Sequence, residues 1–110
     1  MYRKTAASAA MILTALSCSL LFAAKAGDAE KGKASFDDNC TVCHNTSTDE
    51  KKMGPALKGL FKRATLKNGK KMTEANVLAV INAGGNGMPA YADMLNDEEK
   101  ANILVYLKTL

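Results

Sequence analysis

Residues 40–44 read CTVCH, and this motif constrains the fold and the chemistry of the chain more than any other stretch. It contains two of the three cysteines and the only histidine of the 110 residues. On a helix, positions three and four residues apart share one face, so Cys40, Cys43 and His44 would all reach the same side of the backbone. The motif therefore predicts one site that uses two thiols and one imidazole together.

Four kinds of site place two cysteines at this spacing. A thioredoxin-like centre needs a strand–helix–strand setting, and no convincing alternating apolar pattern indicates a strand in the chain. A tetrahedral zinc site needs four good ligands, and there is no second Cys/His pair. A simple disulfide would leave His44 without a role. The pattern favours the fourth kind, a covalently attached c-type haem, whose vinyl groups the thiols bond and whose iron the imidazole binds.

Residues 1–26 have the layout of a secretory signal peptide. A short basic start precedes an uncharged run over residues 6–24, and Ala24 and Ala26 place small residues where a signal peptidase cleaves. We expect cleavage after Ala26, which would leave residues 27–110 as one domain in the periplasm. The apolar run is about as long as a minimal membrane-spanning helix. A retained membrane anchor is therefore the less favoured alternative.

Cleavage would also remove most of the excess positive charge. The full chain has 15 basic and 11 acidic residues, and the leader holds three of the basic residues and no acidic one, which leaves the mature domain at +1. Near-neutral charge, no tryptophan and few aromatic residues argue against nucleic-acid binding. A domain this small often depends on a disulfide, a metal or a cofactor for stability.

Apolar periodicity and capping residues predict three helices in the mature domain. The first follows Asp28 as its N-cap, and Gly32 on it would let another helix cross closely. The second follows the N-cap Thr73 and ends at a pair of glycines. The last follows Asn96, which pairs with Glu99 in a capping box ahead of an apolar stripe. Polar loops join these helices.

With these features in this order, the chain resembles the small bacterial class I cytochromes c over essentially all of residues 27–110. The shared features are a glycine and an aromatic residue ahead of CTVCH, the segment GPALKGLFKR after it, the stretch GMPAY at residues 87–91 and an aromatic residue in the last helix. The resemblance implies an all-α class I cytochrome c fold, with three to five helices wrapped around one covalently bound haem c.

The resemblance also implies roles for the residues around the motif. Cys40 and Cys43 would form the thioether links, and His44 would bind the iron through Nε2. Its other ring N–H would be donated to the backbone carbonyl of Pro55, which fixes the tautomer. Arg63, the only arginine of the mature domain, lies where the family often has a propionate partner. The family often has a tryptophan near the propionates, and this chain has none.

The sixth iron ligand must come from a residue other than histidine, and a neutral thioether is the best remaining donor. The mature domain has four methionines, at positions 53, 72, 88 and 94. Met53 lies too close to His44 in sequence to reach the opposite haem face easily. Met88 is the expected ligand, because it sits in a glycine-rich loop closed by Pro89 and matches the family's Met-Pro loop.

An iron with both axial positions filled has no place for a substrate, so the expected function is one-electron transfer between redox proteins outside the cytoplasm, not enzyme catalysis. Eight basic residues and no acidic one fall within 51–71, which predicts docking to acidic partner surfaces. Membrane contact is expected only through a retained leader or membrane-bound partners. The alternatives are a haem enzyme or ligand sensor with an open iron site, and a haem subunit of a larger oxidoreductase complex.

Overall fold

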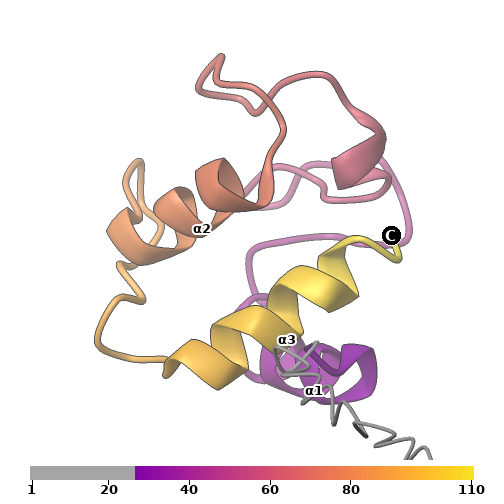
Figure 1. The fold of residues 1–110 in the computed structure, drawn as a ribbon. Helices are drawn as coiled ribbons and strands as arrows, with labels where there is room; N and C mark the ends of the chain where they lie inside the picture. Colours follow the sequence, from indigo (N-terminus) through magenta and orange to yellow (C-terminus); the bar gives the residue numbers. More distant parts are fainter. Residues whose placement is uncertain (1–26) are drawn as a thin grey trace, which may run out of the picture.

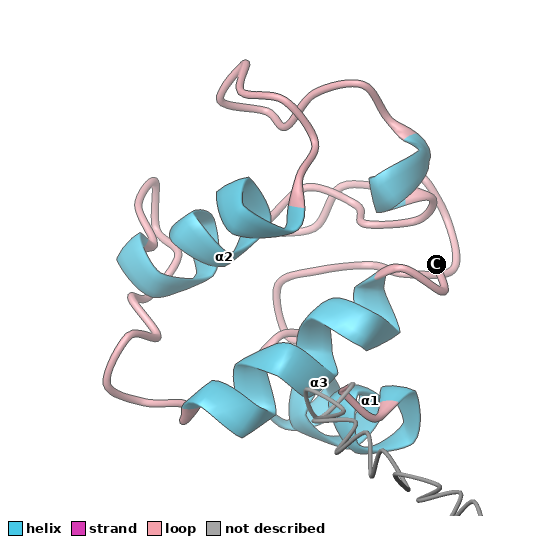
Figure 2. Ribbon diagram, in the orientation of Figure 1, coloured by secondary structure: helices cyan, strands magenta, loops and turns pink. Residues whose placement is uncertain are grey.

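The computed structural model describes residues 27–110, and the predicted signal peptide lies outside the described residues. The described part is all-α, as predicted. It consists of α1 (Ala29–Asn39), a single 3-10 turn η1 (Leu60–Lys62), α2 (Glu74–Ala83) and α3 (Asp97–Leu107). Figure 1 shows α1 and α3 packed together at one end of the domain and α2 on the other side of α3. Long loops make up much of the remaining chain (Figure 2).

The packing of α1 against α3 depends on a glycine. A Cβ atom at Gly32 would overlap the backbone carbonyl of Asn102, so only glycine lets the two helices approach this closely. The predicted close crossing is therefore confirmed. Two further contacts hold it: the Asp28 N–H donates to Asn102 Oδ1 at 2.7 Å, and the Phe36 and Tyr106 rings lie 5.3 Å apart between centroids.

The three predicted N-caps are also confirmed. The Asp28 carboxylate accepts hydrogen bonds from the first turn of α1, and the Thr73 hydroxyl oxygen accepts one from the Asn76 N–H at 3.1 Å. Asn96 and Glu99 each accept the other's backbone N–H through their side chains, at 2.8 and 2.9 Å. These bonds satisfy backbone donors that a helix start leaves unpaired.

One hydrophobic core joins the helices and the loops. Its buried members come from all three helices, from η1 and from the segment between α2 and α3: Phe36, Leu60, Val77, Tyr91, Leu95, Ile103, Leu104 and Leu107. At the end of α3, the Lys108 ammonium pairs with the carboxylate of Glu74 and lies 6.0 Å from the centre of the Phe61 ring. The start of α2, η1 and the end of α3 are thereby held together. Among residues 27–110, no helix is long and apolar enough to span a membrane.

Candidate functional site

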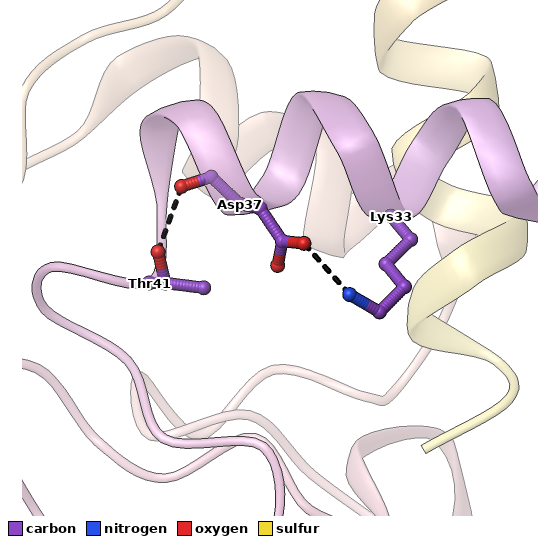
Figure 3. Close-up of polar contacts among 3 residues, drawn as sticks. All are labelled: Lys33, Asp37 and Thr41. Carbon is purple, nitrogen blue, oxygen red and sulfur yellow. Dashed lines mark hydrogen bonds and ion pairs between the residues drawn. The ribbon is translucent and has the colours of Figure 1, made fainter.

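The CTVCH motif lies just beyond α1 rather than on it, so the expectation of a helical motif is wrong. The helix ends at Asn39, and Cys40 already departs from helical geometry with a φ of −120°. The Thr41 hydroxyl donates to the Asp37 carbonyl at 2.7 Å (Figure 3). That carbonyl is the acceptor that the Thr41 N–H would use in a continuing helix, and this competition favours ending the helix here.

A hydrogen-bonded turn takes the place of the helix and keeps the motif compact. The N–H groups of Cys43 and His44 both donate to the Cys40 carbonyl, at 3.1 and 2.9 Å. The spacing of one helical turn is therefore retained without a helix. The two thiols and the imidazole therefore lie within one five-residue turn directly after α1.

The thiols of Cys40 and Cys43 are free and half-buried. Burial, followed by the neighbouring Cys43 thiol, raises the pKa of the Cys40 thiol to about 11. Reactive dithiols and metal-bound thiolates have lowered pKa values instead. Within residues 27–110, no group of three or more His, Cys, Asp or Glu side chains converges to hold a metal ion.

The imidazole of His44 is oriented by a backbone carbonyl. Its Nδ1 lies 2.7 Å from the oxygen of Pro55, and because a carbonyl only accepts, Nδ1 carries the proton in this bond. The Nε2 atom is then left with a free lone pair, which is the state an iron ligand needs. Gly54 makes the arrangement possible, since a Cβ there would lie 2.6 Å from His44 Cε1 and 2.9 Å from Nδ1.

Exposure divides the four methionines into two pairs. Met53 is 80% exposed and Met94 is 62% exposed, whereas Met72 and Met88 pack against the hydrophobic core. Met88 closes a tight turn in which it exchanges two backbone hydrogen bonds with Gly85, at 2.9 and 3.0 Å. Such a turn holds the Met88 backbone in place while its side chain lies against the core.

The turn at Met88 contains a signal that sequence reasoning overlooked. Asn86 and Gly87 occupy its two central positions with φ values of 52° and 90°. Asn-Gly at these positions is the usual signature of a tight hairpin turn with both central residues left-handed. Its glycine content alone predicts only a glycine-rich loop.

Tyr91 is a second residue that sequence reasoning used only as part of the GMPAY stretch. Its side chain is buried, and its hydroxyl donates to the Asn39 carbonyl at 2.9 Å, across 52 positions of sequence. Burial, followed by the nearby Cys40 and Cys43 thiols, raises the pKa of Tyr91, so the hydroxyl keeps its proton at neutral pH. No local pattern in the sequence indicates this long-range bond.

Arg63 lies directly after η1 and is half-buried. Its Nη2 donates to the carbonyls of Ala56 and Lys58, at 3.0 and 2.8 Å, and so braces the loop that follows Pro55. A guanidinium has five N–H donors, so other donors are left for an anionic group.

The donor set fits a covalently attached haem. It offers two neutral thiols free of a disulfide, an imidazole with Nε2 available, and a core-packed thioether on a well-defined turn. Seven apolar residues that pack in the core are candidates to line the haem, and all are buried or half-buried: Leu57, Leu60, Phe61, Val77, Leu78, Ile81 and Leu104. Haem would add apolar area to this core.

Comparison with known proteins points in the same direction. Residues 27–107 match the family model described as cytochrome C oxidase, cbb3-type, subunit III. The cytochrome c-553-like protein of Synechocystis sp. (strain ATCC 27184 / PCC 6803 / Kazusa) is 34% identical over 85 residues, which cover 76% of this chain and 70% of that protein. Cytochrome c6 of Leptolyngbya boryana is 34% identical over 80 residues, which cover 73% of this chain and 89% of that protein. The structure of cytochrome c6 from the diatom Phaeodactylum tricornutum matches with a TM-score of 0.61 and 28% identity, over 76% of this chain and 93% of that one.

Proposed function

The chain belongs to the small class I monohaem cytochromes c, and on that premise we propose that it carries single electrons between redox proteins outside the cytoplasm. It is an electron-transfer protein and binds one covalently attached haem c. The observation that carries the site assignment is the hydrogen bond between His44 Nδ1 and the Pro55 carbonyl, which leaves Nε2 free beside two free thiols.

In this proposal, Cys40 and Cys43 hold the haem through thioether bonds, and His44 binds the iron through Nε2. When bound, the haem supplies a single iron that takes up and releases one electron. The Pro55 carbonyl fixes the ring orientation of His44 and, by accepting the Nδ1 proton, raises the basicity of Nε2. The N–H of Gly54 donates to the Cys43 carbonyl at 2.8 Å, which ties this carbonyl-bearing segment to the motif.

Met88 is the residue that we propose would bind the iron together with His44. Its loop is closed by two backbone hydrogen bonds, whereas Met53 and Met94 have most of their surface exposed. A thioether ligand favours the reduced iron over the oxidised one and raises the potential. By binding the iron, Met88 would also keep small ligands away from it, as suits a carrier.

Arg63 is the proposed partner of a haem propionate. Buried carboxylates need hydrogen-bond donors, and an arginine provides several in a fixed arrangement. The bonds from Arg63 to the carbonyls of Ala56 and Lys58 hold the guanidinium in one orientation. Both bonds use only the Nη2 nitrogen of Arg63. The N–H groups on the other two guanidinium nitrogens would therefore remain to donate to the propionate.

The proposed partners present acidic surfaces. All seven lysines between positions 51 and 71 are exposed, and the same span contains no acidic residue: Lys51, Lys52, Lys58, Lys62, Lys67, Lys70 and Lys71. A local excess of this size would steer negatively charged surfaces toward the segment after the motif although the domain is nearly neutral. Redox encounters of this kind use small, transient interfaces.

The proposed location is the periplasm, reached through cleavage of residues 1–26. The basic start, the uncharged run and the small residues at Ala24 and Ala26 support it. The mass of the haem-bearing protein purified from its own cells tests the cleavage. A mass that corresponds to residues 27–110 plus haem is expected, and a mass that includes the leader would favour a membrane anchor instead.

The filled iron site is tested on the holoprotein, produced together with a c-type haem maturation system. We expect the oxidised wild type to show the sulfur-to-iron charge-transfer band, and the reduced wild type not to bind carbon monoxide. Met88→Ala should lose the band and bind carbon monoxide. Met94→Ala, which changes an exposed methionine, is the matched control and should behave as the wild type.

Two results would contradict the assignment. A band that persists in Met88→Ala and disappears in Met72→Ala would move the ligand to the other core-packed methionine. A wild type that binds carbon monoxide readily would mean an open iron, and the haem enzyme or ligand sensor would then be the better description.

A further inference from the structure

The loop that carries Met88 is fixed to the rest of the domain at several points. The Tyr91 N–H donates to the Ile81 carbonyl at 2.9 Å, which ties the loop back to α2. The buried Lys100 side chain on α3 donates to the Ala92 carbonyl at 2.9 Å. These contacts connect the loop to α2 and α3, which are its neighbours along the chain.

The Tyr91 hydroxyl makes a different connection. Its bond to the Asn39 carbonyl joins this loop to the end of α1, one residue before Cys40. Within residues 27–110, no other hydrogen bond links the loop 84–96 to α1 or to the CTVCH motif. Asn39 is the last residue of α1, so its carbonyl has no partner within the helix and a buried phenol satisfies it.

We propose that Tyr91 is a positioning residue that keeps Met88 on the iron by fixing the Met88 loop to the segment that carries the haem attachment. This inference rests on the proposed ligation by Met88. Tyr91 is three residues beyond Met88, and Pro89 between them restricts the backbone because its ring fixes φ. When Met88 leaves the iron, the loop moves and the Tyr91–Asn39 bond breaks, so this bond stabilises only the ligated state.

The consequence is a specific change in ligand exchange at the iron. An external ligand such as imidazole binds the oxidised protein only after Met88 has left. A bond that is present in the closed state and absent in the open state lowers the population of the open state. Removing one net hydrogen bond should therefore raise the apparent affinity for imidazole about fivefold.

The test is an imidazole titration of the oxidised holoprotein, followed by loss of the sulfur-to-iron band. Tyr91→Phe keeps the buried ring and removes only the hydroxyl, and we expect it to bind imidazole about fivefold more tightly than the wild type. Tyr106→Phe is the matched control, because it also removes a hydroxyl from a tyrosine ring that packs against the same core. The Tyr106 hydroxyl donates no hydrogen bond to any described residue. It should bind imidazole as the wild type does.

Three outcomes separate this inference from the proposed function. A wild type without the band would overturn the ligation by Met88, and the role of Tyr91 would fall with it. If the wild type shows the band but Tyr91→Phe binds imidazole within twofold of both the wild type and the control, only the role of Tyr91 is overturned. A selective gain in Tyr91→Phe would support it.

A second measurement needs no variant and applies even if Tyr91→Phe fails to mature. The hydroxyl proton of Tyr91 in the reduced and oxidised wild-type holoprotein should exchange slowly with water by NMR, because it is buried and hydrogen-bonded. Saturating imidazole should make this exchange markedly faster. Unchanged slow exchange in the imidazole adduct would mean that the bond survives the loss of Met88, and the inference would be wrong.

Discussion

At the scale of single residues, the environment of His44 depends on a glycine that carries no chemistry. Gly54 lies against the imidazole, and the next residue, Pro55, supplies the carbonyl that accepts from Nδ1 at 2.7 Å. The missing side chain at position 54 lets the backbone approach the ring closely enough for this bond. The two adjacent residues therefore support His44 in different ways. Gly54 leaves room for the imidazole ring, and Pro55 supplies the carbonyl that accepts its hydrogen bond.

Gly54→Ala should displace the imidazole, because a Cβ would lie 2.6 Å from His44 Cε1. We expect the free energy of unfolding to fall by about 1–3 kcal/mol, as for other overpacked sites. A weaker Nδ1 bond would also make Nε2 a poorer donor, which should raise the reduction potential. Chemical denaturation and redox titration of the holoprotein measure the two effects.

The control for this substitution is Gly59→Asn. Gly59 has a φ of 65° and open space around it, and asparagine tolerates this conformation. The free energy of unfolding of Gly59→Asn should stay within about 0.5 kcal/mol of the wild-type value. If Gly54→Ala matches this control in both stability and potential, the close approach to His44 has no energetic importance.

At the scale of elements, the packing of α1 against α3 stabilises the domain by more than the poor helix propensity of Gly32 destabilises α1. Gly32 lowers the propensity of α1 by about 1 kcal/mol relative to alanine. The same residue allows contact with the Asn102 backbone, and the buried Asn102 side chain then accepts the Asp28 N–H at 2.7 Å. The cost within one helix is offset by packing between two helices.

Gly32→Ala should therefore destabilise the protein by about 2 kcal/mol or more, because backbone rather than a mobile side chain stands in the way. Ala34→Gly, on the exposed side of α1, should destabilise it by about 1 kcal/mol through propensity alone. Thermal unfolding of the two holoproteins compares them. A Gly32→Ala variant that is more stable than the wild type would show that propensity dominates at the crossing.

At the scale of the whole molecule, the distribution of charge matters more than its sum. The domain of residues 27–110 is close to neutral, yet the lysines at positions 51–71 are exposed in a span free of acidic residues. This basic span begins next to the motif, since the Lys52 ammonium donates to the Thr41 carbonyl at 3.2 Å and the Gly54 N–H to the Cys43 carbonyl. A charged reagent approaching the motif would experience this local field.

Oxidation of the reduced holoprotein by anionic ferricyanide should slow as salt is added, because added ions screen the attraction. Lys51→Glu should slow the reaction about threefold at low ionic strength. Lys31→Glu makes the same change of charge on α1, outside the span of residues 51–71, and should have a smaller effect. Stopped-flow mixing measures the rates, and equal effects of the two variants would mean that only the net charge matters.

The features that the sequence determined by itself are those that depend on neighbours within about four residues. Asp28, Thr73 and Asn96 were predictable as N-caps because a capping side chain bonds backbone groups two or three residues away. The glycines that end α2 and the spacing of CTVCH are local in the same sense. The family and the all-α class followed from such motifs and their order along the chain.

The tertiary structure decided what depends on contacts between distant segments or on competition among local bonds. CTVCH forms a turn, and the Thr41 hydroxyl competes for the carbonyl that a longer helix would need. The packing of Met88 against the core and the bond from Tyr91 to Asn39 arise only after the helices have packed. A sequence pattern records which groups each residue offers, whereas packing decides which of these groups meet, because it brings together residues separated by tens of positions.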